Sequence, residues 1–64
     1  MDQLEMAVRT GRRVALVRRG TEYIVTARRL VHAGRRDALV GFLPMTGEEL
    51  RFDLLDLDEF QVLP

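Results

Sequence analysis

The residues best suited to chemistry in this chain are its arginines. Ten arginines and a single histidine are its only basic side chains, and eight of the arginines form the doublets 12–13, 18–19, 28–29 and 35–36. A guanidinium group binds carboxylate or phosphate oxygens through paired hydrogen bonds. The doublets fall at predicted strand ends and turns. There they can keep sheet edges soluble, or they can form a basic rim for phosphate groups.

The other groups with chemical potential are few. The acidic cluster Asp53, Asp56, Asp58 and Glu59 matches no calcium-loop spacing and has no glycine for the turn, so we expect a solvated turn that pairs with arginines. His32 is the only histidine, and cysteine and serine are absent, so neither a zinc site nor a Ser–His or Cys–His nucleophile can form. A domain this small also has little room for a deep pocket. The sequence therefore predicts no metal, no cofactor and no enzymatic activity.

The charges are balanced overall but unevenly placed along the chain. Residues 1–36 hold nine arginines and three acids, a balance of +6, whereas residues 37–64 hold one arginine and seven acids, a balance of −6. A net charge of zero does not favour general nucleic-acid binding, although a local basic face still could bind. In a regular strand we expect each arginine doublet to place one side chain on each face.

The length and composition place these groups on one small domain, residues 1–64. Apolar residues make up 47% of the chain, which is enough for a core, but no apolar run is long enough to span a membrane. The acidic N-terminus does not resemble a signal peptide, and cysteine is absent. These features predict a soluble, cytoplasmic domain.

Two periodicities divide the domain. Residues 1–11 are predicted to form a short helix, which Asp2 can cap and Gly11 ends. From residue 12 the apolar residues alternate, with turns predicted at 18–21, 33–37 and 45–48 and a 3₁₀ turn at 56–59 before the last strand. This pattern predicts a mainly β fold, a small five-stranded antiparallel barrel of the Sm-like or SH3-like kind over 12–64, because closure removes exposed edges. The predicted core is Val14, Leu16, Val25, Leu30, Leu39, Phe52, Leu54 and Leu57.

The chain from Gly11 onward resembles the core of the WYL domain. The similar segments are 11–16, 23–31, 39–42, 51–57 and 62–63. That family comprises bacterial regulatory modules with an Sm-like barrel, usually fused to a winged-helix DNA-binding domain, and in several members the barrel senses a nucleotide or nucleic acid. The chain departs from the family at its Trp-Tyr-Leu triplet, where it has 37–39 as Asp-Ala-Leu, and at Asp56, where the family has arginine. Among cationic ligand contacts, the resemblance carries over only Arg29 and Arg51.

Two functions are compatible with this sequence. The first is a non-enzymatic, self-associating or partner-binding module of a bacterial system for transcription regulation. A run that is apolar on both strand faces supplies more apolar surface than one face can bury, and a marginal core favours a homo-oligomer, most simply a two-fold dimer. The predicted interface residues are Leu39, Val40, Phe42, Leu43, Pro44 and Met45.

The alternative is a ligand-sensing barrel that binds a nucleotide or nucleic acid through a basic rim. The predicted contacts are Arg13, Arg18, Arg28, Arg29 and Arg51. We expect the affinity to be weak, because Asp56 would repel phosphate and Arg51 would pair with an acidic neighbour.

Overall fold

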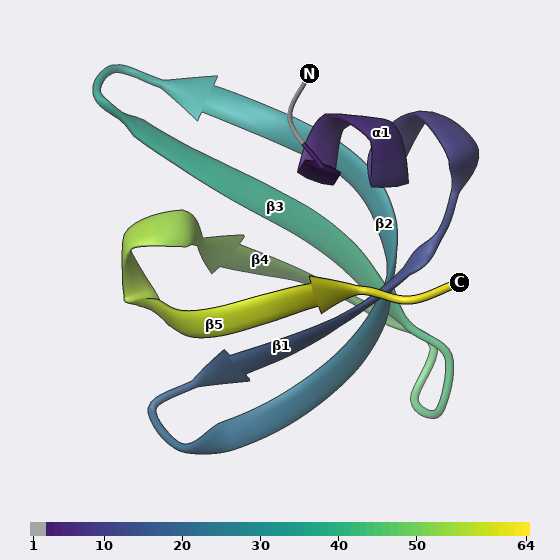
Figure 1. Ribbon diagram of the computed structural model, residues 1–64. Helices are drawn as coiled ribbons and strands as arrows, with labels where there is room; N and C mark the ends of the chain where they lie inside the picture. Colours follow the sequence, from purple (N-terminus) through teal and green to yellow (C-terminus); the bar gives the residue numbers. More distant parts are fainter. Residues whose placement is uncertain (1–2) are drawn as a thin grey trace.

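The computed structural model describes residues 3–64, which form one short helix and a five-stranded antiparallel sheet (Figure 1). The elements are α1 (Gln3–Thr10), β1 (Arg13–Arg18), β2 (Thr21–Ala33), β3 (Arg36–Leu43), β4 (Glu48–Asp53), the 3₁₀ helix η1 (Leu54–Asp56) and β5 (Leu57–Val62). The strand order in the sheet is β4-β3-β2-β1-β5. The predicted mainly β fold, with one short helix and a 3₁₀ turn before the last strand, is confirmed.

The helix α1 ends at Thr10, one residue before the predicted stop at Gly11. Its apolar face buries Leu4 and Ala7 in the same cluster as the sheet residues, which explains how a helix of only two turns is held in place. The proposed cap Asp2 lies outside the described residues.

The β1–β2 hairpin turns at two residues that both adopt left-handed backbone conformations. Arg19 has φ 51° and Gly20 has φ 79°, and the flanking residues Arg18 and Thr21 face each other across the ladder. A two-residue turn with two positive φ values matches the right-handed twist of the strands, and glycine adopts it without steric cost. The predicted turn at 18–21 is therefore confirmed.

The long strand β2 serves two parts of the sheet, as its length predicts. It pairs with β1 through residues 21–26 and with β3 through residues 26–33, and it curves through the whole molecule (Figure 1). Its register with β3 shifts between Ala27 and Arg29, so Arg28 is the extra residue of a β-bulge. A bulge bends the strand and increases its twist, which turns the two halves of the sheet toward each other.

The core lies on the concave side of this sheet, beneath α1. Five of the eight predicted core residues are fully buried, namely Val14, Leu16, Val25, Leu39 and Phe52. The other three, Leu30, Leu54 and Leu57, are half-buried and pack against them. The alternation of apolar residues therefore predicts the core-facing side of each strand correctly. We call the opposite side of the sheet the outer face.

The strand β3 is buried on both faces over residues 38–41. Leu39 faces the core, whereas Ala38 and Val40 lie on the outer face and are nevertheless 2% and 6% exposed. At Gly41 a Cβ atom would lie 2.5 Å from Cγ2 of Val25, so only glycine fits between β2 and β3 without displacement. The strand ends at Leu43, immediately before Pro44.

The sheet is not closed into a continuous ladder. Its edges are β4 and β5, which are joined in the chain by η1 rather than paired with each other. The 3₁₀ turn occurs at Leu54–Asp56, two residues before its predicted start, because the Asp53 carboxylate accepts a hydrogen bond from the Leu55 N–H at 3.2 Å and caps it there. Residues 57–59, which were expected in the turn, belong to β5 instead. Within residues 3–64 no helix is long and apolar enough to cross a membrane.

Candidate functional site

The bulge in β2 places two adjacent arginines on the same face. Arg28 and Arg29 are both exposed, whereas Ala27 before them is buried and Leu30 after them packs against the core. Strict alternation would send one arginine to each face, so that expectation is wrong at this doublet. The extra residue of the bulge is the physical reason, because it breaks the two-residue period of the strand.

Arg51 joins these arginines from a neighbouring strand. Val40 on β3 lies opposite Arg29 on one side and opposite Arg51 on the other, so the three residues form one row across β2, β3 and β4. Adjacent strands are about 4.8 Å apart, which separates the two arginine backbones by about 10 Å. The Val40 side chain, 6% exposed, forms an apolar floor between the two cations.

A second row extends the cationic surface toward β1. Phe42 faces Thr26 on β2, and Thr26 faces Arg13 on β1. The guanidinium carbon of Arg28 lies 5.0 Å from the centroid of the Phe42 ring, which fixes this arginine over the outer face by a cation–π contact. We call the surface formed by Arg13, Arg28, Arg29 and Arg51 the arginine face.

The arginine face has little internal charge compensation. Within residues 3–64 the ion pairs are Arg36 with Asp53, at 3.1 Å, and His32 with Asp37, at 2.9 Å. None of the four arginines takes part in either pair, so the expectation that Arg51 pairs with an acidic neighbour is wrong. Asp53, two residues from Arg51 on the outward side of β4, pairs with Arg36 instead. Glu49, opposite Phe42, is the remaining acid along these rows.

Arg18, the fifth predicted contact, lies apart from this surface. Its guanidinium carbon is 5.2 Å from the Tyr23 ring centroid and 5.0 Å from that of Phe52, and its Nη2 donates a 3.4 Å hydrogen bond to the Tyr23 hydroxyl. It therefore covers the core rings between β2 and β4. Asp56 lines a surface hollow with Arg18 and Arg19, and this hollow does not include any residue of the arginine face.

The predicted interface residues occupy different environments. Leu39 and Val40 are buried by the chain itself, so neither offers a surface to a partner in this structure. Phe42 and Leu43 are half-buried, and Pro44 and Met45 are exposed in the β3–β4 turn. The six residues therefore do not form one continuous exposed patch, because the outer face of β3 is covered as well as its core face.

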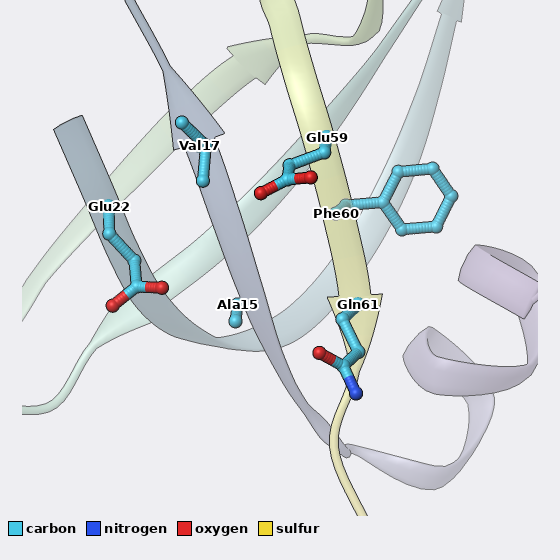
Figure 2. A pocket seen from close by; sticks show the side chains of 6 residues that line it. All are labelled: Ala15, Val17, Glu22, Glu59, Phe60 and Gln61. Carbon is cyan, nitrogen blue, oxygen red and sulfur yellow. The ribbon is translucent and has the colours of Figure 1, made fainter. Parts of the chain in front are cut away.

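A second charged feature lies on the outer face of β1, and of its residues the sequence analysis named only Glu59. Val17 faces Glu22 on β2 and Glu59 on β5. The two carboxylates extend over β1 from its two sides, above a floor of Ala15 and Val17 (Figure 2). With Gln61 they line a hollow of about 280 Å³. We call this feature the carboxylate groove.

The remaining titratable groups have local roles. The Asp58 carboxylate accepts a hydrogen bond from the Gly20 N–H at 3.3 Å, and Asp53 caps η1, so the acidic cluster of the sequence is divided between two turns. The hydrogen bond and the charge of Asp37 raise the pKa of exposed His32 above 6.5. In the described part of the chain no group of three or more potential metal ligands converges.

Comparison with known proteins adds no assignment to this geometry. The chain matches no protein-family model and no curated protein sequence. The function must therefore be argued from the two charged surfaces themselves.

Proposed function

We propose that this domain is a non-enzymatic binding module whose arginine face binds the phosphate backbone of a nucleic acid. One observation carries the proposal: a β-bulge directs Arg28 and Arg29 to the same face as Arg51, and none of these cations is paired with a carboxylate within residues 3–64. Unpaired guanidinium groups bind phosphate oxygens and release the counterions condensed on the nucleic acid.

The shape of the arginine face favours phosphate contacts over base contacts. Single-strand binders normally stack bases on exposed aromatic rings. Here the Phe42 ring is covered by Arg28, and the Tyr23 and Phe52 rings are covered by Arg18. Binding is therefore expected to be independent of sequence, with a dissociation constant of about 10⁻⁴ to 10⁻⁶ M at physiological salt.

The resemblance to WYL domains supports the same proposal, because the family's ligand contacts correspond here to Arg29 and Arg51. These two residues flank Val40 in one row. On this view the domain is a WYL-like regulatory barrel of the bacterial cytoplasm, in which η1 and side-chain packing complete the closure between β4 and β5. Binding at the outer face needs no cofactor and no enzymatic step.

The test is a fluorescence anisotropy titration of a labelled 20-base-pair duplex with the unaltered chain and three variants. Arg29→Ala and Arg51→Ala are each expected to weaken binding about threefold to tenfold at low salt and to flatten its salt dependence. Arg35→Ala is the matched control, because Arg35 is exposed in the β2–β3 turn and lies outside the arginine face. It should have a smaller effect.

Two outcomes would contradict the proposal. The first is an absence of binding even at low salt, where phosphate contacts are strongest. The second is an equal loss in all three variants, which would indicate that only total charge matters. Sub-micromolar binding of a single-stranded oligonucleotide at physiological salt would instead indicate a base-reading site.

Self-association is the second candidate function, and a different surface favours it. The exposed apolar side chains include Phe60 on β5, at 41%, and Met6 on α1, at 45%. Both lie beside the β5 edge of the sheet, whereas Met45, which is 95% exposed, lies in the β3–β4 turn.

A further inference from the structure

The strand β5 presents an open edge with its hydrogen-bonding groups in a defined order. It pairs with β1 on one side, and within residues 3–64 no strand pairs with it on the other. The Leu63 N–H donates to the Arg13 carbonyl at 2.9 Å, and Val14 faces Val62 in the same register. Hydrogen-bonded and non-hydrogen-bonded residue pairs alternate along an antiparallel ladder. Residues 59, 61 and 63 therefore direct their N–H and carbonyl groups toward β1. Phe60 and Val62 therefore direct theirs toward the free edge, whereas Asp58 is the extra residue where the register with β1 shifts beside Val17.

The sequence of β5 is self-complementary about Phe60. If a second copy pairs antiparallel across a two-fold axis through this residue, Phe60 faces Phe60 and Glu59 faces Gln61 of the second copy. Asp58 then faces Val62, so no two carboxylates are directly opposed. Centring the axis on Glu59 would oppose two carboxylates, which is unfavourable. The Phe60-centred register also pairs the outward backbone groups of Phe60 with those of Phe60 in the second copy, because this residue directs its N–H and carbonyl groups toward the free edge.

The side chains around this edge fit the same arrangement. The Phe60 ring points away from the carboxylate groove toward α1 (Figure 2), and at 41% exposure it lacks a covering partner. Beside Val62 is an apolar hollow of about 290 Å³, lined also by Met6 and by Arg12. The edge thus offers backbone and apolar complementarity to a copy of itself.

The other edge of the sheet does not offer this combination. The core-facing Phe52 of β4 is fully buried, and the outward residues Glu49, Arg51 and Asp53 are all charged. The exposed apolar side chains near β4, Met45 at 95% and Leu55 at 72%, lie in the turns that flank this strand, whereas Phe60 lies within β5 itself.

We propose that the chain forms a two-fold symmetric dimer through antiparallel pairing of β5 with β5 of a second copy, centred on Phe60. The dimer continues the sheet across the interface, so each copy loses one free edge. The proposal is independent of nucleic-acid binding, because the arginine face lies on other strands. Backbone pairing and apolar contact make the association nearly insensitive to salt.

The first test uses the absence of native cysteine in the chain. In the proposed dimer the Cα atoms of the two residues at position 60 are about 5.5 Å apart, a separation that a disulfide can span. Phe60→Cys should therefore cross-link to itself under mild oxidation, at protein concentrations that leave Ile24→Cys monomeric. Ile24 is a matched control, because it is 47% exposed in a strand but lies on the outer face of β2.

The second test measures association by sedimentation as a function of protein concentration and salt. Phe60→Lys places two positive charges opposite each other and should raise the dimer dissociation constant at least about tenfold, with unchanged circular dichroism. Ile24→Lys should leave it unchanged. In the unaltered chain, amide exchange of Phe60 should slow as the concentration rises.

Three results would overturn this dimer. A monomer at millimolar concentration would exclude it. A dimer in which Phe60→Cys fails to cross-link would place the contact elsewhere. An association that high salt abolishes would indicate that the arginine face of one copy binds the carboxylate groove of another.

Discussion

The arginine face and the carboxylate groove are built on one plan with opposite charge. In each, two like-charged side chains lie in one row across three strands, with a valine between them. In the groove the row is Glu22, Val17 and Glu59, on strands β2, β1 and β5. On the arginine face it is Arg29, Val40 and Arg51, on strands β2, β3 and β4.

The difference between the two surfaces arises in β2, the strand that they share. Around Glu22 the ladder between β2 and β1 is regular. One carboxylate from β2 and one from β5 therefore lie on the outer face beside Val17. Around Arg28 the bulge adds a second cation beside Arg29. Arg51 comes from the acidic half of the chain and Glu22 from the basic half, so strand pairing, rather than position in the sequence, sets the polarity of the surface.

The largest difference between the two regions should appear when a small apolar side chain is enlarged in each, by one methyl group at Gly41 and by two at Ala15. Gly41→Ala would place Cβ 2.5 Å from the Val25 side chain beneath the arginine face, so we expect a loss of about 1–3 kcal/mol in the free energy of unfolding. Ala15→Val extends into the open carboxylate groove and should change stability by less than about 0.5 kcal/mol. Urea denaturation measures both. Equal losses would show that β1 and β3 are packed with the same tightness.

The electrostatic contrast can be sharpened by neutralising the groove. The double variant Glu22→Gln, Glu59→Gln removes two negative charges without touching the arginine face. It should strengthen duplex binding about twofold to fivefold at low salt, and the gain should vanish at high salt because the distant charges are screened. Anisotropy titrations at two salt concentrations measure this. A weakened affinity would show that the groove contacts the nucleic acid directly.

The smallest effect concerns His32, on the β2–β3 hairpin. Asp37 raises its pKa above 6.5 through a hydrogen bond and an ion pair. A raised pKa in the folded state means that the stabilisation is fully present below about pH 6.5 and is lost as the pH rises through the folded pKa. An NMR titration of the His32 ring should show this elevation, and Asp37→Asn should remove it. An unchanged pKa in that variant would assign the elevation to Glu5, the other acid that raises it.

The regular parts of this fold follow from the sequence because burial imposes a period of two. Val14 and Leu16, or Leu39 with its buried neighbours, identify their strands directly, and glycine marks the hairpin between β1 and β2. The bulge also leaves a signal. Ala27 and Leu30 are apolar residues three positions apart with two arginines between them, a spacing that a regular strand cannot place on one face.

Other features depend on contacts that a linear pattern does not contain. Leu54 and Leu55 continue an apolar alternation, yet Asp53 caps a 3₁₀ turn there because its carboxylate reaches the Leu55 N–H. The predicted interface at residues 39–45 assumed that only one face of the strand is covered. In the structure both faces of β3 are covered over residues 38–41. The carboxylate groove combines residues that are distant in sequence, and their charges gather only through the pairing of β1 with β2 and β5.

The ladder between β1 and β5 also has a consequence for how the chain folds. The strands β1 to β4 form consecutive hairpins, in which only short loops have to close. Pairing of β1 with β5 instead brings together Val14 and Val62, which are far apart in the sequence. Closing that long loop carries the largest entropic cost, so we expect β5 to dock last during folding and to detach first when the native state opens. Until it docks, β1 is itself an exposed edge. Pairing of β5 with β1 is therefore the last step that protects the β1 edge. Before this step the unpaired edge of β1 can bind a strand of another chain.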